Sequence, residues 1–433
     1  MIVPEPKPSP RGALGWLVLG CAIILMLGVI DSRRLPNGGF GAWTTFLLVG
    51  APVAVLGAAL VLGGGGWRRT PTAARITLLT FTALLGFATF SALTHTQLVH
   101  DRIGDLGTIT APTSYILLPL LSALVTCVLG WVLASGPPVA QLPRLISVTS
   151  WSLLGVVTIA VARMTLRGEL GDRLNSTFAG ASTIHLALLL GLAGFIGLAR
   201  AGHARLPHLV GAAGTCIALL ATGSRAGLLL AGVFLLFQVL TLPLGGRGAL
   251  IRGAAVIALT VTALFLALLV PDLQERLTFV DEYRARNAST AMAAWLQSPV
   301  TILLGNGQGT LWPWTAYEHG LVPVVADWDL WTPWGPVLPS PHSTWLWAVA
   351  ELGLLGFALL ALTAVPPAVQ GILRGDALAR SLGMGLLLSL VAFTTDTHLV
   401  KVFPVALVWW ITVFVVLRLV DSRDNGCMEM KAS

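Results

Sequence analysis

The chain has 433 residues, of which 55% are hydrophobic and 10% are charged, and its mean hydropathy is +0.84. Soluble domains carry roughly 25% charged residues, and disordered chains combine low hydrophobicity with high charge, so both classes are excluded. The net charge of +7 does not indicate a nucleic-acid partner, because basic residues in a membrane protein usually set its orientation. The composition therefore predicts an all-α polytopic membrane protein surrounded by membrane lipids.

Twelve apolar runs predict about twelve transmembrane helices, since a hydrocarbon core ~30 Å thick needs ~20 residues per helix. The first run follows a polar, Pro-rich tail without an A-x-A cleavage site, so we expect it to remain as the first helix. Only three residues, Gly223 to Arg225, separate the seventh and eighth runs, which leaves a very tight turn between two helices. The runs cover residues 14–30, 42–62, 76–94, 114–135, 145–166, 182–199, 207–222, 226–242, 251–271, 342–362, 378–396 and 402–420.

These runs divide the chain into three parts. Residues 1–271 hold predicted helices 1–9, residues 272–341 form a loop, and residues 342–433 hold helices 10–12 and a tail. A loop of about 70 residues is usually functional or disordered, and this one is too rich in Trp and Pro for a disordered tether. Within it, residues 281–297 predict a helix that ends before Pro299.

The basic residues predict the orientation. If both termini are cytoplasmic, the cytoplasmic segments hold 15 of the 26 Lys and Arg residues but only five of the 19 acidic residues. This excess agrees with the positive-inside rule. We therefore expect a bacterial inner (plasma) membrane protein whose large loop between helices 9 and 10 is periplasmic.

Several arginines on the predicted periplasmic side are candidates for binding an anion, because topology does not require them there. Arg225, in ATGSRAG, stands at the mouth of a helix between apolar runs. A guanidinium at that depth is usually functional or paired, and it matches a phosphate bidentately. The alternative is a snorkelling or salt-bridged arginine. Arg173, in GDRLNSTFAG, precedes residues that could open a helix toward an anion, although a plain N-capped helix start explains them too.

The large loop adds Arg284 and Arg286, which lie on its predicted helix and could equally be solvated. The segment LLGNGQG that follows lacks the strand and helix of a nucleotide-binding fingerprint, so we interpret it as a flexible turn.

His342 is the most informative histidine, because it stands where the loop re-enters the membrane. Its unperturbed pKa of ~6.5 suits a base near neutral pH, although a packed or capping histidine is the common alternative. His319 and His398 are further candidates. Glu351 either pairs with an arginine or belongs to a polar pathway, and its helical phase argues against contact with His342. Histidine and cysteine spacings predict no metal site, and no cofactor is indicated.

The order of these motifs resembles that of the O-antigen ligase/polymerase superfamily of bactoprenol-dependent membrane glycosyltransferases. The resemblance rests on the twelve-run layout, the late large loop and three local motifs. These motifs are T-x-S-R-A-G from Thr222, the arginine helix leading to P-x5-GNGQG, and H-S-x-x-L-x-x-x-x-E-L-G-L-L-G from His342. Around Arg173 the chain reads RLNSTFAGAST, where the family often has an Asn-Pro-Asn-like element.

Within this superfamily the chain is most similar to the O-antigen ligases. The resemblance implies inverting, metal-independent transfer of a polysaccharide from undecaprenyl diphosphate to lipid A–core on the periplasmic side, in lipopolysaccharide biosynthesis. It assigns His342 as the base, with Arg225, Arg286, Arg284 and Arg173 at the diphosphate and a preference for Arg286 over Arg284. An O-antigen polymerase, a protein O-oligosaccharyltransferase and a transporter of lipid-linked glycan remain alternatives. The oligomeric state is left open.

Overall fold

The computed structural model describes residues 15–20, 22–23, 39–94, 113–168, 181–241, 282–312, 330–332, 335–337 and 340–432. These residues are almost entirely helical, with one small hairpin in which β1 pairs antiparallel with β2. The elements are α2 (Gly39–Gly63), α3 (Gly66–Arg69), α4 (Thr72–Thr94), α5 (Thr113–Ser135), η2 (Val139–Gln141), α6 (Leu142–Leu166), α7 (Ala181–Arg200), α8 (Arg205–Thr222), α9 (Arg225–Leu240), α12 (Glu282–Trp295), α13 (Pro299–Leu304), β1 (Leu330–Thr332), β2 (Gly335–Val337), α15 (Thr344–Arg374), α16 (Ala377–Ala392), α17 (His398–Lys401) and α18 (Phe403–Ala432).

Long apolar helices confirm the prediction of an all-α, multi-pass membrane protein. Among the described residues, eight helices are long and apolar enough to span a membrane, and α9 and α16 are shorter apolar helices. The predicted run 251–271 and most of the run 14–30 lie outside the described residues, so the count of twelve stays a prediction.

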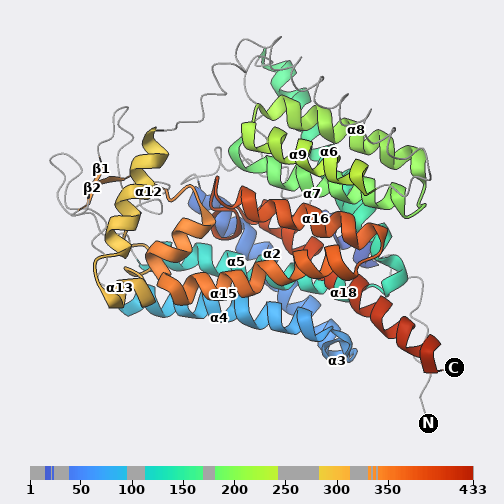
Figure 1. Ribbon diagram of the computed structural model, residues 1–433, viewed down its shortest axis with the longest axis horizontal. Helices are drawn as coiled ribbons and strands as arrows, with labels where there is room; N and C mark the ends of the chain where they lie inside the picture. Colours follow the sequence, from blue (N-terminus) through green and yellow to red (C-terminus); the bar gives the residue numbers. More distant parts are fainter. Residues whose placement is uncertain are drawn as a thin grey trace.

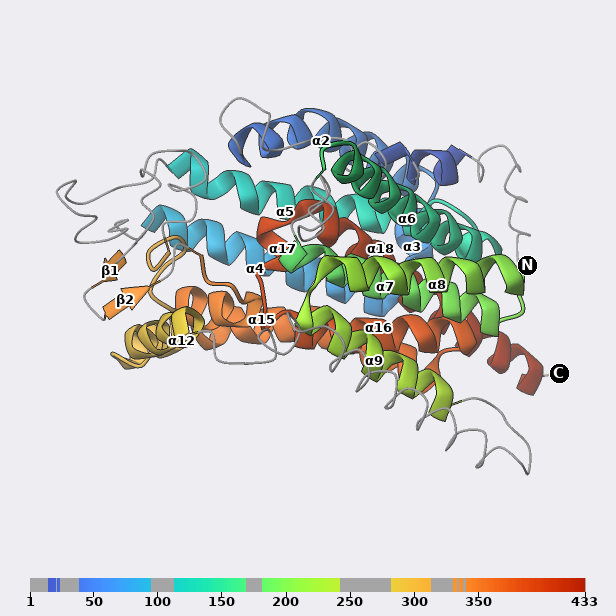
Figure 2. The same cartoon turned by 90° about the horizontal axis from the view of Figure 1, so that it is seen from above.

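The long helices run side by side, with α18 and α7 in the interior (Figure 1, Figure 2). Large buried aromatic side chains, such as Trp409, Trp410 and Phe195, fill the core between them. The outer helices α2, α4 and α8 instead expose apolar residues, for example Leu48, Phe90 and Leu206. Exposed apolar surface on this scale marks contact with another apolar phase, which for helices of this length is lipid.

Two separate helices do meet at the tight turn after Thr222. Gly223 adopts a left-handed conformation (φ 60°) that ends α8, and Ser224 begins α9 by accepting a hydrogen bond from the Gly227 N–H at 3.2 Å. A left-handed glycine and a serine N-cap are a common way to end one helix and start the next. The three-residue division of the predicted seventh and eighth runs is confirmed.

Helix α15 differs from the single straight run predicted at 342–362. Gly353 has non-helical backbone angles (φ 65°, ψ −166°) that divide α15 into a first limb, 344–352, and a second limb, 354–374. The rings of Trp345 and Phe357 lie 5.5 Å apart, although twelve residues span ~18 Å in a straight helix. The first limb is therefore folded back toward the second limb at Gly353 (Figure 1).

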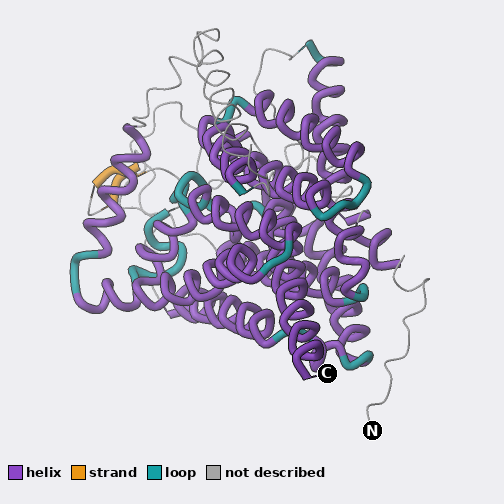
Figure 3. Tube along the Cα trace, turned by 45° about the vertical axis from the view of Figure 1, so that its right-hand side comes forward, coloured by secondary structure: helices purple, strands orange, loops and turns teal. Residues whose placement is uncertain are grey.

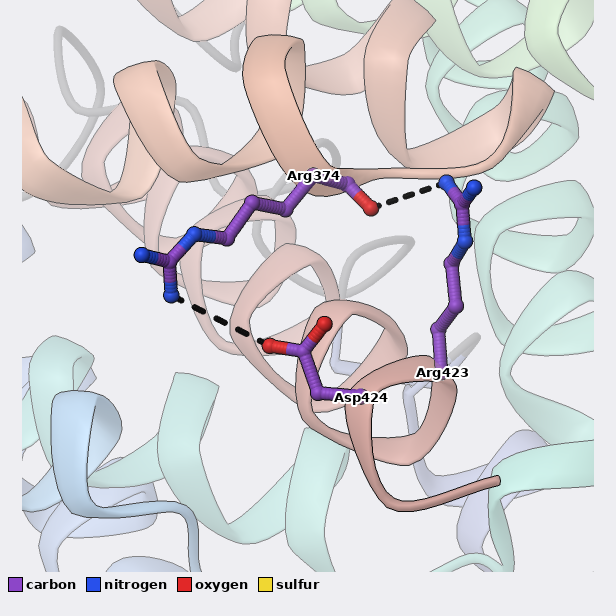
Figure 4. Close-up of polar contacts among 3 residues, drawn as sticks. All are labelled: Arg374, Arg423 and Asp424. Atoms are coloured by element: carbon purple, nitrogen blue, oxygen red, sulfur yellow. Dashed lines mark hydrogen bonds and ion pairs between the residues drawn. The ribbon is translucent and has the colours of Figure 1, made fainter. Parts of the chain in front are cut away.

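The two ends of the molecule differ in character. One end carries α12, α13 and the β1–β2 hairpin, and the C-terminal part of α18 lies at the other end (Figure 2). At that second end Arg374 pairs with Asp424 at 3.9 Å, and Arg423 donates to the Arg374 carbonyl at 2.9 Å (Figure 4). This is the end that the distribution of basic residues predicts to be cytoplasmic.

Candidate functional site

The N-terminus of α9 places Arg225 against α7. A Cβ on Gly227 would lie 2.6 Å from the Cβ of His185, so glycine alone lets α9 approach α7 here. Gly223 makes the left-handed turn before α9, and Gly227 makes the close contact with α7. Arg225 itself is half-buried at this junction.

Two buried histidines link α7 and α17 to the start of α15. The ring of buried His185 lies 5.8 Å from the ring of His398, nearly perpendicular to it. His398 is fully buried, and its backbone N–H donates to Thr344 Oγ1 at 3.0 Å. Thr344 begins α15 two residues after His342. Through these contacts the turn that bears Arg225 is connected to the turn that bears His342.

His342 lies just before α15 and is half-buried. Its φ of 45° is left-handed, which is uncommon for a residue other than glycine and occurs preferentially at functional sites. The next residue, Ser343, caps α15 by accepting from the Leu346 N–H and donates to the Phe393 carbonyl, both at 3.1 Å. The backbone around His342 is thus fixed to the end of α16.

Asp396, which the sequence analysis did not select, lies at the centre of this region. Its buried carboxylate accepts a hydrogen bond from the Thr397 N–H at 2.7 Å. Burial raises the pKa of this carboxyl, but the charges of His398, Lys401 and His342, together with that hydrogen bond, outweigh burial and lower it. Burial lowers the pKa of His398 and Asp396 offsets part of the effect.

A sequence signal for these residues does exist. Asp396, His398 and Lys401 are the ionisable residues of TTDTHLVK, a short polar stretch that begins at the end of the eleventh apolar run and precedes the twelfth. Ionisable groups at the edge of apolar runs are usually functional or paired. Lys401 Nζ also donates to Ser340 Oγ at 3.5 Å, which connects α17 to the residues just before His342.

The predicted loop helix is confirmed as α12, and it lies beside the His342 turn. Arg286 is half-buried whereas Arg284 is exposed. The next residue, Asn287, is buried, and its Nδ2 donates to the Pro341 carbonyl at 3.1 Å while its Oδ1 accepts from Trp312 Nε1 at 2.7 Å. Asn287 therefore ties the arginine helix to the turn that bears His342.

The glycine-rich segment 305–309 is a clasp and not a flexible turn. The Glu351 carboxylate, buried in α15, accepts hydrogen bonds from the N–H groups of Gly309 at 2.9 Å and Leu311 at 3.3 Å. The Gly307 N–H also donates to the backbone carbonyl of Glu351, at 3.0 Å. Glu351 was predicted to be an arginine partner or a member of a polar pathway. Its hydrogen bonds instead hold the glycine-rich segment against α15 at the break.

The remaining predicted residues have mixed outcomes. Arg173 and His319 lie outside the described residues. In the part of the chain that the structure describes, no group of three or more His, Cys, Asp or Glu side chains is arranged to hold a metal ion. We name as the arginine–histidine cluster the residues Arg225, His185, His398, His342 and Arg286, which come from five segments. The rings of His185 and His398 lie side by side, and Arg225, His342 and Arg286 each stand within two residues of one of the contacts above.

Comparison with known proteins adds no family assignment, since no family model and no curated protein matches the chain.

Proposed function

We propose that the protein is a membrane glycosyltransferase of the O-antigen ligase type. It takes a glycan from undecaprenyl diphosphate and transfers it to a lipid A–core acceptor at the periplasmic face of the inner membrane. The observation that carries the proposal is the arginine–histidine cluster. Two arginines from motifs more than 60 residues apart and a half-buried histidine are joined through direct contacts of their neighbours.

The cluster suits a lipid-linked diphosphate. Arg225 and Arg286 can each present a fork of donors to phosphate oxygens, and the positive end of the α9 dipole adds to their charge. Arg286, half-buried, fits this role better than the exposed Arg284. Arg173 enters the proposal through the family resemblance alone. The charge of these groups becomes more stabilising as the leaving diphosphate gains negative charge, and this difference lowers the barrier.

His342 is the proposed base. It takes the proton from an acceptor hydroxyl while that oxygen bonds to the anomeric carbon, and the bond from this carbon to the diphosphate oxygen breaks with its electron pair. Such a base typically contributes ~10²–10⁴-fold. A single displacement of this kind inverts the anomeric configuration. Asp396 would stabilise the imidazolium form of His342, because its negative charge lies within electrostatic reach of that ring.

The arginines and histidines of this cluster lie on connected turns. This argues against a transporter, in which ionisable groups are spread along a path across the membrane. The test is transfer by the purified protein from radiolabelled undecaprenyl-diphosphate glycan, with and without lipid A–core. A ligase labels lipid A–core alone. Labelled, lengthened undecaprenyl glycan without lipid A–core would indicate a polymerase, and no new product in either case would overturn the proposal.

A further inference from the structure

A surface that the proposed reaction does not use lies where α12 turns into α13. We infer that this α12–α13 elbow, residues 292–304, is seated in the lipid bilayer boundary and contacts the acyl chains of the adjacent leaflet. The inference is independent of the proposed function, because none of the residues 292–304 takes part in the proposed reaction. These residues belong to the loop that was predicted to be periplasmic.

The elbow exposes apolar side chains without any charge. Its exposed fractions are 64% for Val300, 56% for Leu296 and Leu303, 40% for Leu304 and 37% for Met292. From Asn287 to Trp312 the sequence holds no charged residue. On an aqueous surface such a contiguous apolar patch marks contact with an apolar partner.

The depth of the elbow identifies that partner as lipid. Leu303 lies directly beside the α15 break, because a Cβ on Gly353 would be 2.5 Å from the Leu303 carbonyl carbon and oxygen. From that break the second limb of α15 runs ~32 Å to Arg374, which is about the thickness of the hydrocarbon core. Arg374 marks one boundary through its ion pair with Asp424, so Gly353 and Leu303 lie near the other.

The exposed face of the elbow also continues the surface of the spanning helices. Helix α13 packs against α15, and just beyond the break Leu354 and Phe357 of α15 are exposed. On the other side the Gln308 N–H donates to Ser91 Oγ of α4, next to exposed Phe90. These helices meet lipid, and the elbow extends that surface without interruption.

The direction of α12 agrees with this placement. In Figure 1 α12 lies beside the left-hand end of α15, and in Figure 3 the helix next to the orange strands stands at the edge of the helix bundle. Helices that lie in the interface keep an apolar face in the acyl chains and their polar residues in the headgroups. In α12 the arginines stand in the first half and the apolar Met292 in the second. Because Asn287 ties α12 to the His342 turn, this seat would also fix the height of Arg286 above the bilayer.

The test places a fluorescent probe on single cysteines in vesicles of phosphatidylethanolamine and phosphatidylglycerol. The native cysteines are replaced, and one cysteine is introduced by Val300→Cys, by Leu303→Cys or, as a matched control on exposed α12, by Ser289→Cys. We expect acyl-chain nitroxide lipids to quench probes at 300 and 303, and aqueous iodide to quench them at least ~3-fold less than the probe at 289. Equal iodide quenching at all three positions would overturn the inference.

A second measurement uses the native chain, in case the cysteine replacements prevent folding. Vesicles containing phospholipids with a diazirine on the acyl chain are irradiated, and the labelled peptides are identified by mass spectrometry. Adducts on Met292 to Leu304 support the seat in lipid. Adducts on α4 and α15 without any on this segment would overturn it. In the quenching experiment, protection of the probe at 300 from iodide that disappears when the protein is diluted in lipid would also overturn it, because it would indicate a second copy of the chain.

Discussion

The clasp at the α15 break makes a quantitative prediction for Gly305→Ala. A Cβ at this position would lie 2.3 Å from the Glu351 carbonyl carbon and oxygen and 2.4 Å from the Leu352 nitrogen. All three atoms are backbone, so no side chain can move aside. The backbone angles of Gly305 (φ 79°, ψ −177°) also fall in a region used almost only by glycine.

Both effects reduce the free energy of unfolding. The backbone conformation costs about 1–3 kcal/mol for alanine, and overpacking against a fixed backbone costs typically 1–3 kcal/mol more. We therefore expect Gly305→Ala to lose roughly 2–6 kcal/mol. Gly353→Ala should behave alike, because its Cβ would lie 2.5 Å from the Gly305 nitrogen at φ 65°.

The matched control is Gly86→Ala in α4, where an added Cβ meets nothing within 4 Å. Alanine in place of a helical glycine should stabilise that variant by roughly 0.5–1 kcal/mol. The assay is reversible unfolding in mixed detergent–SDS micelles, followed by circular dichroism. If Gly305→Ala proved as stable as Gly86→Ala, the close approach of the glycine turn to α15 would be refuted.

Three further predictions concern the site. Asn287→Ala should lower the free energy of unfolding by ~2–4 kcal/mol, because Pro341 and Trp312 each lose a buried hydrogen-bond partner. The control Ser289→Ala, at an exposed position, should change it by less than ~0.5 kcal/mol. Equal free energies for the two variants in SDS unfolding would contradict this. In the folded protein the pKa of His398 lies below its ordinary ~6.5, so the unfolded chain binds more protons and the free energy of unfolding falls as the pH drops below ~6.5. The thermal unfolding temperature of His398→Gln should therefore depend less on pH between 5 and 6.5. The same pH dependence in both proteins would exclude His398 as its source. Arg225→Lys should reduce transfer at least ~10-fold because the planar fork is lost, and full activity would remove Arg225 from the diphosphate site.

Asp396 does not disturb the acid-stability measurement. Its net pKa lies below the ordinary value near ~3.9, so its contribution to stability is present above that pH and is lost only as the pH falls further. Of these two residues, His398 and not Asp396 therefore accounts for the pH dependence between pH 5 and 6.5. His185, His342 and Lys401 remain unchanged in the His398→Gln comparison.

Sequence reasoning predicted the elements that depend on local composition. Apolar runs gave the long helices, and the polar helix ahead of Pro299 appears as α12, Glu282–Trp295. The turn at Gly223 was also predictable, because a glycine and a serine that end and start helices act locally. Three of the predicted site residues, Arg225, Arg286 and His342, lie within the described part of the chain. Each stands one or two residues from a contact that connects its segment to another part of the site.

The parts that sequence reasoning missed depend mostly on contacts between distant segments. A straight continuation of α15 through Gly353 satisfies hydropathy as well as a break does. The break is revealed only by the 305–309 turn that occupies the same space. Glu351 was expected either to pair with an arginine or to belong to a polar pathway, because ionisable groups in apolar runs are usually paired or functional. In the structure, backbone N–H groups from that turn donate to it. Asp396 was overlooked although TTDTHLVK marks it locally, and only its proximity to His342 depends on a distant segment.

The most direct test of the proposed site is a cryo-electron microscopy structure of the full chain in nanodiscs with undecaprenyl diphosphate. The account predicts density for the two phosphates between the guanidinium groups of Arg225 and Arg286, with His342 within reach of the adjoining anomeric position. Density for the phosphates at the end that carries Arg374 and Arg423, or no bound diphosphate at saturating lipid, would contradict it.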